Sequence, residues 1–107
     1  MGDAPSDQIA TKVLFENDRV KVWEMRLEPG QTLPRHRHEN DYVQIMLDGD
    51  RVAADIDPEA GGNWAGETYV EAEITNGLTL FCKKGGIENT INVGEKPFYQ
   101  VIVELKN

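Results

Sequence analysis

Residues 30–49 read GQTLPRHRHENDYVQIMLDG and hold both histidines of the chain, His36 and His38. Side chains alternate between the two faces of a β-strand. A single residue between the histidines therefore predicts that both imidazoles lie on one face, about 7 Å apart at their Cα atoms. Two imidazoles on one face can converge on one metal ion, with nitrogen–metal distances of about 2.0–2.2 Å. The stretch therefore predicts a strand that carries two metal ligands.

Glycines flank this pair of histidines at a regular spacing. The His-x-His pattern by itself also fits two surface histidines in a charged loop, so the flanks carry the argument. Gly30 stands six residues before His36, and Gly49 stands eleven residues after His38. With these glycines the stretch resembles the first motif of the cupin family, G-x5-H-x-H-x3/4-E-x6-G.

A second stretch strengthens this resemblance. Residues 77–92 read GLTLFCKKGGIENTIN, which is similar to the second cupin motif, G-x5-P-x-G-x2-H-x3-N. Gly77, Gly85 and Asn92 occupy motif positions in frame. The resemblance spans about residues 20–104 and implies a small β-barrel of the cupin type, a double-stranded β-helix or jelly roll.

The rest of the chain agrees with an all-β fold. No segment keeps a 3.6-residue apolar period over a dozen positions, whereas short strand-like runs recur between turn signals. Asp48-Gly49-Asp50 and Asn76-Gly77 are predicted hairpin turns. We expect one domain over residues 9–107, after a disordered or extended lead-in over residues 1–8. The strands are expected, besides the histidine segment, at residues 9–15, 20–27, 42–47, 51–56, 67–73, 78–82, 87–93 and 98–105.

Composition excludes several classes of partner. The chain has 107 residues, a formal net charge of -8 and a sequence pI of about 4.6. Nucleic acids and anionic membranes both require a basic face, so neither is an expected partner. The N-terminus has no apolar core of a signal peptide, and Cys82 is the only cysteine. We therefore expect a cytoplasmic protein in which Cys82 is a buried structural thiol.

Two positions depart from the cupin motifs. The glutamate position of the first motif holds Tyr42 at the x3 spacing, or Val43 at the x4 spacing, and the histidine position of the second motif holds Glu88. The resemblance thus implies a metal site of His36, His38 and Glu88. Two histidines and one carboxylate are typical of non-haem Fe(II) sites, although Mn, Ni or Zn also fit these ligands.

The assignment of Glu88 has an alternative, in which it faces solvent while Ile87 and Ile91 fill the core. Glu39 or Asp41, just after the histidines, is a further candidate for the carboxylate ligand. Because imidazole must be neutral to bind a metal, we expect metal occupancy to fall below the ordinary histidine pKa of about 6.5.

Two further residues are candidate catalytic groups by their strand parity. Tyr42 follows the histidines on the inward face, where it either donates its hydroxyl to a bound water or substrate, or fills the barrel with its ring. Gln44 is a polar amide in an apolar run and is expected either to orient a substrate or to form a core hydrogen bond. Trp64, on a glycine-rich loop, is expected at the mouth of the pocket.

The resemblance implies a metal-dependent enzyme that acts on a small oxygenated compound, in the manner of a dioxygenase. A lyase or isomerase would use the same site as a Lewis acid. The alternative is a barrel without turnover, which either binds a small ligand or serves a structural role. The expected partners are a small-molecule ligand and a second copy of the chain. Such a homodimer would form through residues 9–15 or by packing of sheet on sheet.

Overall fold

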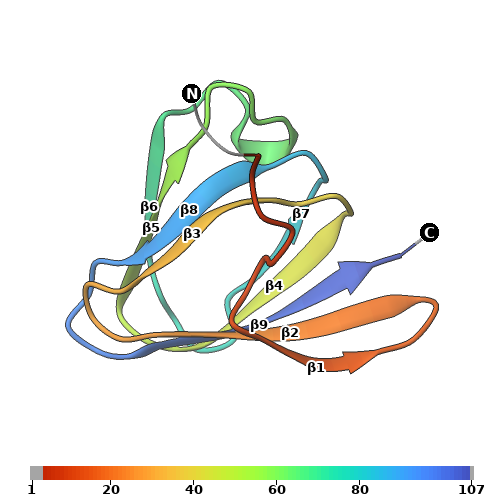
Figure 1. Cartoon of the computed structure of the whole chain (residues 1–107). Coiled ribbons are helices and arrows are strands. Elements are labelled where there is room, and N and C mark those ends of the chain that lie inside the picture. Colours follow the sequence, from red (N-terminus) through yellow and green to blue (C-terminus); the bar gives the residue numbers. More distant parts are fainter. Residues whose placement is uncertain (1–3, 107) are drawn as a thin grey trace.

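The computed structural model describes residues 4–106 and contains two antiparallel sheets that face each other as the walls of a flattened barrel (Figure 1). The five-stranded sheet has the order β1-β2-β9-β4-β7, and the four-stranded sheet has the order β3-β8-β5-β6. This arrangement confirms the predicted all-β, double-stranded barrel. The strands are β1 (Lys12–Glu16), β2 (Val20–Leu27), β3 (Thr32–Arg37), β4 (Tyr42–Asp48), β5 (Arg51–Ile56), β6 (Tyr69–Glu73), β7 (Thr79–Cys82), β8 (Ile87–Asn92) and β9 (Phe98–Leu105), with a 3-10 turn η1 (Gly62–Trp64).

β9 is the central strand of the five-stranded sheet, and its sequence shows the alternating pattern that favours a β-strand. It pairs along its whole length with β2 on one side, and over residues 99–104 with β4 on the other. Its residues alternate between buried and half-buried, as expected for a strand with one face toward a core. The inward set is mixed, with apolar Phe98 and Ile102 beside polar Gln100 and Glu104. Polar groups are thus built into the barrel interior.

Most connections in the fold cross from one sheet to the other. β4 lies in the five-stranded sheet, whereas β5 pairs with β6 and β8 in the four-stranded sheet. The segments predicted as hairpins, at Asp48-Gly49-Asp50 and Asn76-Gly77, are therefore corners between sheets, and the hairpin prediction was wrong. Turn chemistry reverses the chain locally, but the pairing partner is set by which faces must be buried. Gly49 has a φ of 125°, and a Cβ there would lie 3.2 Å from Phe98 Cδ1, so this corner requires glycine.

Asn92, the last residue of the second motif, fastens another corner. Its side-chain amide donates hydrogen bonds of 2.9 Å to the carbonyls of Leu27 and Lys96, and its amide oxygen accepts from the Gly94 backbone at 2.9 Å. The residue is buried, so these bonds satisfy a polar group that would otherwise be costly. The motif position therefore ties the end of β2 to the turn between β8 and β9.

The N-terminal segment lies against the four-stranded sheet. Ser6 forms a parallel bridge beside His36, with its backbone bonded to Arg35 and Arg37. Ile9 and Ala10 are buried, and the first strand begins only at Lys12 rather than at residue 9. Residues 1–3 of the predicted lead-in lie outside the described part of the chain.

The buried residues form two apolar clusters, one between the sheets and a smaller one beneath η1. Cys82 is 1% exposed, which confirms the prediction of a buried thiol, and burial raises its pKa. Within residues 4–106, no helix has the length and apolar character needed to cross a membrane.

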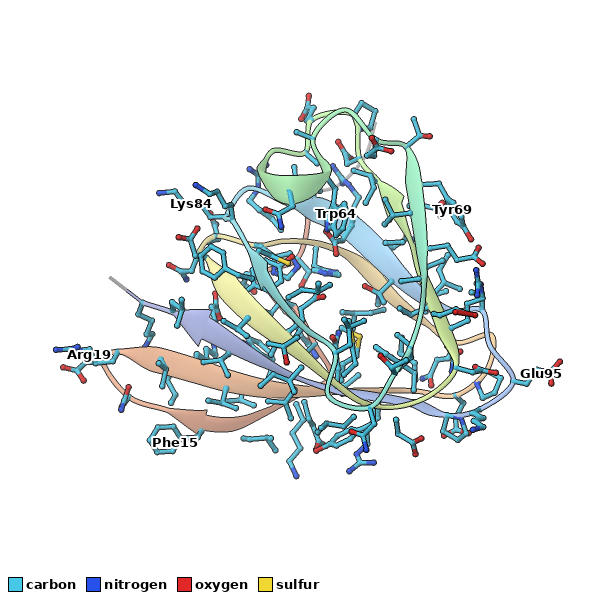
Figure 2. All side chains as sticks on the ribbon, turned by 180° about the vertical axis from the view of Figure 1, so that it is seen from behind. Phe15, Arg19, Trp64, Tyr69, Lys84 and Glu95 are labelled. Atoms are coloured by element: carbon cyan, nitrogen blue, oxygen red, sulfur yellow. The ribbon has the colours of Figure 1, made fainter. Side chains whose placement is uncertain are left out.

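The homodimer stays a prediction, and two exposed aromatic residues distinguish its possible forms. Phe15 on the edge strand β1 is 54% exposed, and Phe81 on the opposite edge strand β7 is 53% exposed. Figure 2 shows Phe15 directed away from the barrel. We expect Phe15→Lys to reduce the mass measured by light scattering if β1 joins two copies. A reduction in Phe81→Lys alone would instead identify packing through the outer sheet face, and a monomeric wild-type protein would contradict the homodimer.

Candidate metal centre

His36 and Glu88 face each other on neighbouring strands. They are direct partners in the antiparallel pairing of β3 with β8. Side chains of such partners leave the same face of a sheet, with Cβ atoms typically about 4.5–5.5 Å apart. Both residues are buried, at 1% and 5% exposure. The sheet register therefore brings an imidazole and a carboxyl together inside the barrel, and it does not place Glu88 in solvent.

A β-bulge in β3 makes this pairing possible. The register of β3 against β8 shifts between Leu33 and His36. At Pro34 and Arg35, β3 therefore contains one residue more than the stretch of β8 that it pairs with. Leu33 and His36 are three positions apart and would face opposite sides of a regular strand, yet both are buried. The bulge thus turns His36 inward, and bulges of this kind commonly redirect side chains next to functional sites.

His38 continues the pairing beyond the end of β3. Its backbone N–H donates to the Gly86 carbonyl at 2.8 Å, and the Gly85 N–H donates to the His38 carbonyl at 2.8 Å. A Cβ at Gly86 would lie 3.2 Å from Glu88 Oε1 and 3.6 Å from His38 Cδ2. The missing side chain at position 86 therefore leaves space between the carboxyl group and the second imidazole.

His36, His38 and Glu88 offer three ligand atoms that all lie within 4.8 Å of one another. The two imidazole centroids are 4.9 Å apart at an interplanar angle of 75°, and His38 Nε2 lies 3.9 Å from Glu88 Oε2. His36 Nδ1 lies 2.9 Å from the Pro34 carbonyl and donates to it, which leaves Nε2 as the nitrogen with the free lone pair. A carbonyl that holds the other ring nitrogen is typical of metal-binding histidines.

The hydrogen bonding of these residues fits a metal ion. Within the described chain, His36 Nε2, both ring nitrogens of His38 and Glu88 Oε1 are buried without a hydrogen-bond partner. Glu104, another buried glutamate, is satisfied by contrast: Trp23 Nε1 donates to one of its oxygens at 3.0 Å and Asn40 Nδ2 to the other at 2.8 Å. Unsatisfied buried groups are rare in native proteins, so a cluster of them calls for a ligand. A divalent cation would satisfy His36 Nε2, one ring nitrogen of His38 and Glu88 Oε1 together.

Burial also sets the protonation states of these groups. It lowers the pKa of His36, opposed in part by the Pro34 hydrogen bond, and together with the charge of His36 it lowers the pKa of His38 to about 3. Burial raises the pKa of Glu88 to about 7. Both imidazoles are therefore neutral at physiological pH and ready to bind a metal. Competition between metal and protons near neutral pH then occurs at Glu88 rather than at the histidines.

The ring of Tyr42 packs flat on His38. The ring centroids are 4.0 Å apart at an interplanar angle of 13°. Burial raises the pKa of this phenol well above its ordinary value, so it stays protonated. Tyr42 thus lies beside the metal centre and supports an imidazole with its ring.

The two other candidate carboxylates lie elsewhere. Glu39 is exposed, and Asp41 accepts a hydrogen bond of 2.8 Å from the Lys84 backbone. The three-residue group found among the described residues contains neither of them.

A cavity of about 300 Å³ opens onto the metal centre from between the two sheets. Gln44 lines it, as does Trp64, which stands near the η1 end of the barrel (Figure 2). Gln100 also lines the cavity and was missed by the sequence analysis, although its inward parity in β9 is the same signal that identified Gln44. The apolar wall includes Met25, Met46, Val52, Leu80, Phe98 and Ile102.

The raised pKa of Glu88 predicts a pH-dependent effect of Glu88→Gln on the metal-free protein. Because the folded-state pKa of about 7 exceeds the ordinary 4.5, burial of the charged form destabilises the fold increasingly as pH rises from about 4.5 to 7. Glutamine carries no charge, so the variant should be more stable than wild type by on the order of 3 kcal/mol at pH 8, and about equal to it below pH 4.5. Urea unfolding across this range measures the difference.

Glu39→Gln is the control for that experiment, because Glu39 is exposed and its charge is solvated in both states. A difference between Glu88→Gln and wild type that stays constant from pH 4.5 to 8 would contradict the assigned ionisation of Glu88.

Comparisons with known proteins agree with the fold and the motifs. The sequence matches no protein-family model and no curated protein. A cupin domain from Bordetella pertussis Tohama I is 30% identical, covers 99% of this chain and 100% of its own, and superposes with a TM-score of 0.75. A conserved protein with a double-stranded β-helix domain from Klebsiella pneumoniae is 22% identical, covers 97% of this chain and 84% of its own, and has a TM-score of 0.65.

An oxalate oxidase shares the fold at 22% identity and a TM-score of 0.62, over 81% of this chain and 42% of its own. The near-complete overlap with the Bordetella cupin domain, together with both sequence motifs and the two-sheet barrel, shows that this chain belongs to the cupin family.

Proposed function

We propose that the protein is a metal-dependent enzyme that converts a small oxygenated compound in the manner of a dioxygenase. The observation that supports this most is the convergence of two neutral imidazoles and a carboxyl group, all buried and unsatisfied, on one cavity. A structural metal site would have its coordination positions filled by protein, whereas two histidines and one carboxylate leave positions open for other ligands.

His36, His38 and Glu88 would hold the metal. A bound Fe²⁺ would supply a redox centre with open positions for oxygen and substrate, and Mn²⁺, Ni²⁺ or Zn²⁺ would supply Lewis acidity. The protein contributes the surroundings: Pro34 orients His36, the Tyr42 ring supports His38, and the cavity wall is mainly apolar.

Gln44 is the proposed substrate-orienting group, because its amide lines the same cavity as the three ligands. For Tyr42 we propose a positioning role through its ring, since that ring stacks on His38.

A barrel that binds a small ligand without turnover is the second candidate. The size of the cavity is at the lower end of the usual range for small-molecule sites, and its wall is mainly apolar, as in many sites that only bind. Such a protein would hold the ligand, with or without metal, and would consume no oxygen.

Metal analysis of three variants tests the proposed site. We expect about one divalent transition ion per wild-type chain after reconstitution and dialysis, because the three ligands form one site. His36→Ala and Glu88→Ala should each lose the ion. Glu39→Ala, which removes an exposed carboxylate three residues from His36, should retain it.

The oxygen electrode then separates the two functions. Fe²⁺-loaded protein is screened with small diketones, thiols and phenols, and we expect oxygen uptake with at least one class that is absent in Glu88→Ala. Retention of the metal by Glu88→Ala would overturn the proposed ligand set. Tight metal binding without oxygen uptake on any class would favour the binding barrel.

A further inference from the structure

Gln100 presents an unsatisfied amide to the cavity. It lies in the middle of β9 with Met25 and Met46 as its neighbours on β2 and β4. The side chain is 2% exposed, and its amide oxygen has no hydrogen-bond partner. The amide nitrogen reaches only the Met25 sulfur, at 3.7 Å. A thioether is a weak acceptor, so both ends of this amide are poorly satisfied.

Such an amide is costly for a folded protein, because a buried donor or acceptor without a partner loses its hydration and gains nothing in return. Methionine or leucine at position 100 would pack between Met25 and Met46 without that cost. The amide is therefore best explained by a polar group of the molecule that fills the cavity.

The charges around the cavity restrict that molecule further. Among the described residues that line it, none is Lys or Arg. The acidic lining residues are Glu88 of the metal centre and Glu71, which is exposed and bonded to Arg51. An anionic group away from the metal would thus be buried without a counter-charge, which is strongly unfavourable. The cavity wall therefore disfavours a ligand with a second charged group, such as a dicarboxylate, and favours a ligand whose remaining surface is apolar.

We propose that the cavity binds a neutral, mainly apolar molecule whose hydroxyl group bonds to the amide of Gln100. The hydroxyl donates to the amide oxygen, while Met25, Met46, Phe98 and Ile102 contact the apolar body. This inference deepens the proposed function, on which it rests, by naming the class of substrate for the same site. Gln100 acts as a specificity-determining residue on the wall opposite the metal ligands.

Three probes of matched shape test this class: 2-naphthol, naphthalene and 2-naphthoate. Binding is measured by calorimetry on the full chain, first metal-free and then Zn²⁺-loaded. We expect metal-free protein to bind 2-naphthol, and to bind 2-naphthoate at least about tenfold more weakly, because the carboxylate is buried without a cation. Gln100→Met should weaken 2-naphthol about fivefold, as expected for one neutral hydrogen bond, and should leave naphthalene binding equal or stronger.

Gln31→Met is the matched control, because Gln31 is an exposed glutamine that does not line the cavity. Thermal unfolding of both variants verifies that they fold. Equal affinities of wild type and Gln100→Met for 2-naphthol, an equal loss in Gln31→Met, or preference for 2-naphthoate in metal-free protein would each overturn the inference.

Metal uptake is measured on the same samples, so that the two proposals fail separately. Binding of 2-naphthol that depends on Gln100 in a protein that takes up no metal would overturn the metal-dependent function and support the ligand class. Full metal uptake with no effect of Gln100→Met would overturn the ligand class alone.

Discussion

The antiparallel pairing of β3 with β8 puts His36 directly opposite Glu88, and the candidate site depends on this register. A shift by one residue would turn every side chain of β3 to the other face. The bulge at Pro34 and Arg35 shifts the register by one residue within β3. Leu33 before it and His36 after it therefore both face inward, Leu33 to the core and His36 to the site. The Pro34 carbonyl, which lies in the bulge, then accepts a hydrogen bond from His36 Nδ1 and holds the imidazole in this orientation. The bulge in β3 therefore sets both the direction and the orientation of the His36 ring.

The barrel interior separates two kinds of polar group. Glu104 and Asn92 are buried and fully bonded, and they stabilise corners and strand ends. Glu88 and Gln100 are also buried, but one side-chain oxygen of each has no hydrogen-bond partner. The first kind can be explained by the fold alone. The second kind costs stability in the free protein, and binding of a metal and a small molecule would recover that cost.

Much of the fold could be predicted from the sequence, because the two motifs indicate a cupin barrel and the residue periodicity indicates where the strands lie. The histidine pair and Glu88 were identified by their motif positions, and the structure places them together. The sheet partners could not be predicted at Asp48-Gly49-Asp50 or Asn76-Gly77, because a turn signal is local whereas pairing depends on the whole barrel. The bulge in β3 was likewise hidden, so the shared face of Leu33 and His36 could not be derived from parity. The inward parity of Gln100 in its strand could have identified it in the same way as Gln44, but only the structure shows that its amide oxygen is unsatisfied.

The most direct measurement of the central claim is anomalous X-ray diffraction from crystals of the protein loaded with Fe²⁺ or Zn²⁺. We predict one strong anomalous peak per chain, bonded to His36 Nε2, to a ring nitrogen of His38 and to a carboxylate oxygen of Glu88, at about 2.0–2.2 Å. A fully loaded crystal with its peak elsewhere, or bonded to the histidines with Glu88 turned away, would contradict it.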